Sequence, residues 1–347
     1  MISKERVFAA VRWREVDCIP VFANKSPMGP ALIGKKLNRD FFLSAESMTK
    51  SELALFEAVD DDVICLNLAP AIQDVLGARL LWPENDHPQF EAPTVFSIDD
   101  VRALEGRLEL NRVLKNDFIQ ALLETTRFVK TQIGESVVLE VNSYGVFNFA
   151  ARLMGIEGLM SATIRDKDLV RRICDVIADL QVALAEPFVE AGATLLSIGD
   201  GMSSPSCISP KIYGELALPY LSKTIQGFKR TGALTLYHPC GGEYPIIDQV
   251  GSTGADILYF SELVDLDVAQ KIFVRRFAVA GGVDPANTLY MGDVHTVDQR
   301  LKETIGKLKH KTGVIIQPGC GLSPNIPIEN LQEMVRATRR YSADMRR

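Results

Sequence analysis

Short apolar runs alternate along the chain with longer stretches in which apolar residues recur every three or four positions. The short runs are rich in β-branched and aromatic residues, which is typical of strands buried on both faces of a parallel sheet. We predict eight strands, at residues 18–22, 63–68, 137–141, 194–198, 234–238, 256–260, 277–280 and 314–317. The first contains Pro20, which cannot donate to a strand ladder, and it has the weakest pattern.

The longer stretches have the periodicity of amphipathic helices. They lie at residues 44–59, 111–133, 166–191, 210–230 and 296–310. Ser209 before Pro210 has the residue types of a helix N-cap and first turn, and Pro327 with Glu329 opens a last helix. Strands that alternate with helices in this way predict an α/β protein, a single (β/α)8 TIM barrel with its active site at the C-terminal ends of the strands.

No repeat, low-complexity tract or linker divides the 347 residues, so we expect one barrel domain over residues 1–347. Hydrophobic residues make up 47% of the chain, which is enough for a large buried core. Residues 69–112 are expected to form a long loop near the mouth of the barrel.

Charge and composition exclude two classes of partner. The net charge of −6 disfavours binding to nucleic acid, which requires a basic surface. No apolar run approaches the roughly 20 residues that span a bilayer. The chain opens with an amphipathic helix pattern rather than a signal peptide, and its six cysteines form no CxxC pair. We therefore expect a cytoplasmic protein in a reducing compartment.

Two motifs carry the strongest chemical signal, YHPCGG at residues 237–242 and PGCG at residues 318–321. His238 and Cys240 are two positions apart, and such residues point to the same side of an extended backbone. Cys320 follows the last predicted strand, whose end shares the rim of the barrel with theirs. One imidazole and two thiolates with an open fourth position are the ligands of a catalytic zinc ion. We predict that His238, Cys240 and Cys320 bind Zn²⁺.

Other polar residues follow the remaining strands and are expected at the same rim. We assign Asp200 and Glu262 to catalysis, with Glu262 also a candidate fourth ligand or a carboxylate that supports the ligands. Asn142 and Tyr144 are assigned to the cofactor and substrate pocket, together with Phe147 and the segment around Trp82. Asp200 has an alternative role, since it also suits the cap of a turn between two glycines.

Structural roles compete with these assignments, because a histidine at a strand end or a buried cysteine often only packs. We assign Cys18, Cys65, Cys174 and Cys207 to packing. The three other histidines lie in polar surroundings and are expected to be exposed; they are His87, His295 and His310. No glycine pair has the GxGxxG spacing of a dinucleotide site.

Motifs along nearly the whole chain carry a family resemblance. They are KERV at 4–7, CIPV at 18–21, ISPKIY at 208–213, LPY at 218–220, HPCG at 238–241, GGVDP at 281–285, PGCG at 318–321 and IPIEN at 326–330. The chain resembles the uroporphyrinogen decarboxylase superfamily, and within it the methylcobamide:coenzyme M methyltransferases. The resemblance implies a (β/α)8 barrel, and it implies zinc held by a histidine, a cysteine two residues later and a distant C-terminal cysteine. These positions are His238, Cys240 and Cys320.

One departure from the superfamily bears on the reaction. Its decarboxylases carry an arginine-rich motif after the first strand, resembling MRQAGR, which binds the carboxylates of a tetrapyrrole. Residues 21–29 of this chain read VFANKSPMG and contain no arginine. The sequence therefore disfavours decarboxylation of a multiply carboxylated porphyrin.

Three hypotheses follow from the residues and the resemblance. In the first, zinc activates a thiol such as coenzyme M, which takes a methyl group from a methylated corrinoid protein. In the second, a methyl ether or similar substrate gives its methyl group to the Co(I) corrinoid of such a protein. In the third, the chain is a metal-free decarboxylase or a binding barrel without catalysis. The expected partners are a cognate corrinoid protein and a small thiol or methyl-bearing substrate.

Overall fold

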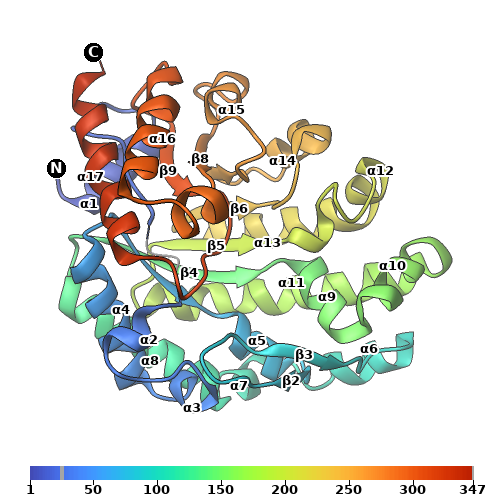
Figure 1. The fold of residues 1–347 in the computed structure, drawn as a ribbon. Coiled ribbons are helices and arrows are strands. Elements are labelled where there is room, and N and C mark those ends of the chain that lie inside the picture. The colour runs from blue at the N-terminus through green and yellow to red at the C-terminus, as the bar shows by residue number, and fades with distance from the viewer. Residues whose placement is uncertain (24–26, 346–347) are drawn as a thin grey trace.

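The computed structural model describes residues 1–23 and 27–345, and a parallel sheet lies at its centre with helices packed against its outer side (Figure 1). In the described part of the chain the sheet has seven strands, ordered β1-β4-β5-β6-β7-β8-β9. They are β1 (Val63–Asn67), β4 (Val138–Tyr144), β5 (Leu195–Gly199), β6 (Leu234–His238), β7 (Ile257–Tyr259), β8 (Ala278–Val283) and β9 (Val314–Pro318). Each matches a predicted strand, so the barrel-like α/β fold is confirmed.

The predicted first strand, residues 18–22, is wrong as a regular strand, because it makes only one bridge, between Val21 and Ile316. Pro20 lacks the N–H group that a longer ladder needs. The segment nevertheless closes the barrel, since it bonds to both edges of the sheet. Phe22 N–H donates to the Ile316 carbonyl at 2.9 Å, and Asp62 N–H donates to the Val21 carbonyl at 3.0 Å.

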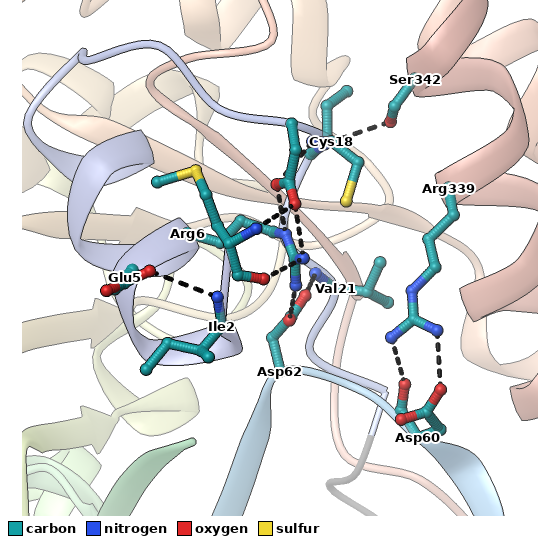
Figure 2. Close-up of polar contacts among 12 residues, drawn as sticks. Ile2, Glu5, Arg6, Cys18, Val21, Asp60, Asp62, Arg339 and Ser342 are labelled. Carbon is teal, nitrogen blue, oxygen red and sulfur yellow. Dashed lines mark hydrogen bonds and ion pairs between the residues drawn. The ribbon is translucent and has the colours of Figure 1, made fainter. Parts of the chain in front are cut away.

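A buried ion pair holds this closure together (Figure 2). The Arg6 guanidinium donates to the Asp62 carboxylate at 2.6 Å, and only 1% of Asp62 is exposed. The other Asp62 oxygen accepts the Val21 N–H at 2.9 Å. Arg6 also pairs with Asp17 at 2.7 Å. The N-terminal helix is thereby fixed to the point where the sheet closes.

Helices connect the strands, and both ends of the chain lie on the same side of the molecule (Figure 1). The helices are α1 (Ser3–Val11), α2 (Gly29–Leu32), α3 (Arg39–Phe42), α4 (Ala45–Val59), α5 (Ala69–Val75), α6 (Ile98–Glu105), α7 (Leu110–Val113), α8 (Asp117–Ile133), α9 (Val146–Met154), α10 (Ile156–Arg165), α11 (Lys167–Glu190), α12 (Pro210–Ile212), α13 (Leu218–Arg230), α14 (Ile247–Ser252), α15 (Leu266–Ile272), α16 (Val294–Lys307) and α17 (Ile328–Asp344). None of the described helices is long and apolar enough to span a bilayer.

The five predicted helices are present, two of them in pieces. The predicted helix 111–133 is split where the Asn116 side chain accepts N–H groups of a new helix, α8. The predicted helix 210–230 begins with Ser209 as N-cap, as expected, and contains a π-helical turn at Tyr213–Ala217. Residues 69–112, expected as a loop, instead fold into helices and an antiparallel hairpin of β2 (Arg79–Leu81) and β3 (Gln89–Ala92).

Side chains that face the barrel axis change from apolar to polar along the strands. A buried cluster at the strand starts includes Val63, Val138, Leu195, Leu234 and Ile257. Because side chains alternate with a period of two, the residues four positions further along face the same way. In three of these strands they are Asn67, Asn142 and His238. The strand pattern therefore carries polar groups to the C-terminal rim.

We predict that Asp62→Ala destabilises the protein by about 3 kcal/mol, because it leaves part of a buried cation and the Val21 N–H without a partner. Urea unfolding at neutral pH measures this loss. Glu46→Ala, which removes an exposed ion pair with Lys50, is the control and is expected to cost at most about 0.5 kcal/mol. A loss below about 1 kcal/mol for Asp62→Ala would show that the closure does not depend on this pair.

Candidate metal centre

Three residues predicted as metal ligands lie together although 80 positions separate the two cysteines. His238 ends β6, Cys240 lies in the following loop, and Cys320 follows β9 by two positions. One ligand atom from each lies within 4.8 Å of the others, and the two sulfur atoms are 3.3 Å apart. In the described part of the chain this is the only such cluster of histidine, cysteine and acidic residues.

The loop after β6 turns sharply to bring Cys240 to this point. Cys240 has a φ of 45°, and Gly241 and Gly242 follow with φ values of 103° and 69°. A left-handed conformation costs energy for a residue with a side chain, and glycines accommodate it freely. The Gly-Gly pair of the motif therefore serves the turn that positions a sulfur atom.

The His238 ring is fixed in the orientation of a metal ligand. Nδ1 lies 2.9 Å from the Tyr259 carbonyl, and the ring stacks on the Tyr259 ring at a centroid distance of 3.8 Å. With the proton on Nδ1, Nε2 carries a free lone pair; it is buried and makes no hydrogen bond to any described residue. A backbone carbonyl behind one ring nitrogen is the usual support of a histidine that binds metal through the other.

The two sulfur atoms are within hydrogen-bond distance of each other. Hydrogen bonding to Cys240 lowers the pKa of Cys320 to about 4. The same hydrogen bond, together with burial, raises the pKa of the Cys240 thiol. The cluster thus offers two cysteine sulfur atoms and one imidazole nitrogen without a hydrogen bond to any described residue. These donors fit a zinc ion, which takes cysteine sulfur and histidine nitrogen and displaces thiol protons on binding.

A cavity of about 390 Å³ opens beside the cluster at the C-terminal ends of the strands. His238, Cys240 and Cys320 form part of its wall. Asn142 and Tyr144, at the end of β4, also line it, and their part in binding a cofactor or substrate stays a prediction. Asn142 donates to the Ser197 hydroxyl at 2.8 Å, and the Arg152 guanidinium lies 4.2 Å from the centre of the Tyr144 ring.

Asp200, predicted as catalytic, has its carboxylate turned to a helix. It is fully buried and accepts N–H groups of Phe147 at 2.8 Å and Asn148 at 3.0 Å, at the start of α9. Burial raises the pKa of Asp200 to about 7. It does not line the cavity, and neither does Phe147. Asp200 thus caps the distant helix α9, whereas the alternative weighed for it was a cap of its own turn between two glycines. Its catalytic role stays a prediction.

Glu262 is exposed and is not part of the ligand cluster. It lies against the loop that carries Cys320, because a side chain at Gly319 would collide with the Glu262 carboxylate and backbone nitrogen. Its assignment to catalysis also remains a prediction. The carboxylate of Asp284, another rim residue, accepts the N–H groups of Ala286 and Asn287.

Two residues of the cavity wall were missed or misjudged from sequence, Glu52 and His87. Burial raises the pKa of Glu52 to about 8. The sequence gives one indication that Glu52 reaches the cavity. Glu52 lies four positions after Met48, so the two side chains share one face of the helix, and Met48 also lines the cavity. The expectation that His87 is exposed is wrong: it is half-buried beside Phe42, because the segment after Trp82 folds over the cavity.

The cysteines that were assigned to packing lie in different surroundings. Cys174 is buried as predicted, whereas Cys207 is exposed and Cys65 lines the cavity.

Comparison with known proteins gives a consistent result. The family model for uroporphyrinogen decarboxylase (URO-D) matches residues 2–341. The chain is 25% identical over 345 residues to a methylcobamide:CoM methyltransferase (MtaA) of Methanosarcina barkeri, covering 98% of each protein. It is 24% identical over 264 residues to a methylated-thiol–coenzyme M methyltransferase of Methanosarcina mazei, covering 76% of this chain and 68% of the other. A solved methyltransferase from Methanosarcina mazei shares the fold, with a TM-score of 0.87, 22% identity and coverage of 98% and 99%.

We predict that Gly319→Ala destabilises the protein by about 2 kcal/mol, because the added methyl group forces the Cys320 loop away from Glu262. Gly321→Ala is the matched control in the same loop, since a methyl group there meets no atom within 4 Å. Urea unfolding of the two variants beside the wild type measures the difference. Equal stability of the two variants would contradict the close packing of this loop.

Proposed function

This chain belongs to the uroporphyrinogen decarboxylase family, and we propose that it acts as a corrinoid-dependent methyltransferase rather than as a decarboxylase. The observation that carries the proposal is the convergence of His238, Cys240 and Cys320 on one cavity. Relatives that match it over nearly their whole length are named methylcobamide:CoM methyltransferases.

His238, Cys240 and Cys320 are the residues that would hold a zinc ion, with the fourth position left to the substrate. Bound zinc supplies a Lewis acid that lowers the pKa of a thiol or polarises an ether oxygen. The protein contributes the rest: the Tyr259 carbonyl fixes the imidazole, and the mainly apolar wall keeps water from the reacting sulfur or oxygen. Asn142 and Tyr144 would orient the substrate.

A methylated corrinoid protein would supply the methyl group at the mouth of the barrel. The sulfur of a substrate thiolate would form the new S–CH₃ bond as the Co–CH₃ bond breaks, and cobalt would leave as Co(I) with the electron pair. In the alternative, the bond between methyl carbon and oxygen of a methyl ether or a similar substrate would break as the methyl group passes to Co(I), and the oxygen would keep the bonding pair and take a proton. In both directions the chain binds and aligns the small molecule and leaves the demanding chemistry to cobalt.

Decarboxylation is less well supported. A substrate with several carboxylates requires several cations, and none of the described residues that line the cavity is lysine or arginine. The stretch 21–29 carries no arginine, and Asn24, Lys25 and Ser26 of that stretch lie outside the described residues.

We predict that the protein, purified under reducing conditions, holds roughly one zinc ion per chain, and that Cys240→Ser and Cys320→Ser lose it. Metal analysis beside circular dichroism separates loss of zinc from loss of fold. Cys207→Ser, an exposed cysteine, is the control and should keep the zinc. No zinc in the wild type, before or after reconstitution, would overturn the proposed mechanism and favour a metal-free function.

The direction of transfer is decided by two assays on the zinc-loaded protein. If a thiol is the acceptor, it should convert methylcobalamin to Co(I) cobalamin, and Cys320→Ser should lower the rate by at least ~100-fold. If a methyl ether is the donor, it should convert Co(I) cobalamin to methylcobalamin. The absorption spectrum of the cobalamin follows both reactions. Absence of both reactions, also with corrinoid proteins as partners, would contradict the proposal.

A further inference from the structure

The charge of the cavity indicates which class of small molecule it takes. We propose that its substrate is an uncharged molecule with an apolar body, and that Glu52 occupies the place in the wall where an anion would need a cation. The inference rests on the proposed methyl transfer and narrows it, since it disfavours sulfonates such as coenzyme M, the acceptor that the names of the relatives specify.

Apolar side chains make up most of the wall away from the candidate metal ligands. They come from the segment that follows the closure of the barrel, from α4 and α8 and from the loop after Cys320, and they include Pro30, Leu37, Phe42, Met48, Leu122 and Leu322. Such surfaces bind the apolar body of a ligand, while a few polar groups fix its orientation.

The described residues that line the cavity include no lysine or arginine to neutralise an anion. Among the described residues that line the cavity, the only ionisable ones outside the metal cluster are Glu52, His87, two tyrosines and Cys65. Burial raises the pKa of Glu52 to about 8 and lowers that of His87, so both are mainly neutral at pH 7. A neutral carboxyl group donates a hydrogen bond, which suits a hydroxyl, ether or carbonyl oxygen.

The amides of the wall are already partly occupied within the protein. Asn142 donates to the Ser197 hydroxyl at 2.8 Å, and Asn148 donates to the Gly199 carbonyl at 3.1 Å. A sulfonate in this cavity would lose its water, and the described residues of the wall would give it neither a cation nor a full set of donors. Burying an unpaired charge in this way is strongly unfavourable, whereas an uncharged group of similar size escapes that cost.

Size points in the same direction. The cavity encloses about 390 Å³, within the range of roughly 300–1,000 Å³ that holds ligands of drug size. A two-carbon thiol would leave much of the apolar wall without contact, while a molecule that carries a ring or a similar apolar group would cover it. Aromatic side chains at the wall, among them Phe41 and Phe42, suit such a body.

Three thiols that share an HS–CH₂–CH₂ unit test the inference on the zinc-loaded full chain. They end in a phenyl ring, a hydroxyl group and a sulfonate (2-phenylethanethiol, 2-mercaptoethanol and 2-mercaptoethanesulfonate), and calorimetry gives their affinities. We expect the phenyl compound to bind tightest, and the sulfonate at least ~10-fold more weakly than the hydroxyl compound. The inference is overturned if the sulfonate binds as tightly as the hydroxyl compound. It is also overturned if the phenyl compound binds more weakly than the hydroxyl compound. In both cases the proposed function stands. If no thiol binds, the inference fails, and the cobalamin assay with methyl ethers decides the proposed function separately.

Glu52→Lys tests the assigned side chain by gain of function. A cation at this position should raise the affinity for the sulfonate by about 10-fold relative to the hydroxyl compound. Glu46→Lys makes the same substitution on the exposed face of α4. It is the matched control and should leave this ratio within about twofold. If folded Glu52→Lys has the same ratio of sulfonate to hydroxyl affinity as the wild type, the role assigned to Glu52 is overturned. If that variant does not fold, the three thiols on the wild type still decide the charge preference.

Discussion

Alternation of side chains along the parallel strands is the constraint on which the site depends. In β6 the inward positions are Leu234, Leu236 and His238, so the imidazole faces the cavity above two apolar layers. Tyr237 points the other way, and its hydroxyl lies 3.2 Å from that of Tyr213 between the strand and the helices. A register shift of one residue would exchange these roles and remove the histidine from the cluster.

The buried pair of Arg6 and Asp62 supports this arrangement from the opposite end of the strands. Without the closure at Val21, β1 and β9 would be free edges of an open sheet. Cys320 follows β9 directly, and its distance from Cys240 depends on the curvature of the whole sheet. A salt bridge near the start of the chain and a cysteine near its end therefore belong to one structural unit.

The sequence predicted the positions of the site residues that lie at the ends of strands, because these follow from strand periodicity. The spacing of His238 and Cys240 and the place of Cys320 after a strand were sufficient to bring them together. Asp200 could not be assigned to α9 from sequence, because 53 and 52 positions separate it from Phe147 and Asn148, whose N–H groups it accepts. Glu52 and His87 reach the cavity through helix packing and a hairpin segment, which local patterns do not encode.

A cavity with candidate metal ligands at one part of its wall and mainly apolar groups over the rest suits the methyl transfer that we propose. The central claim is the metal site, and X-ray absorption at the zinc edge tests it most directly because it counts the donor atoms. The account predicts two sulfur atoms and one imidazole nitrogen on each zinc, with one sulfur lost in Cys320→Ser. A zinc ion surrounded only by oxygen and nitrogen, or an unchanged spectrum in Cys320→Ser, would contradict it.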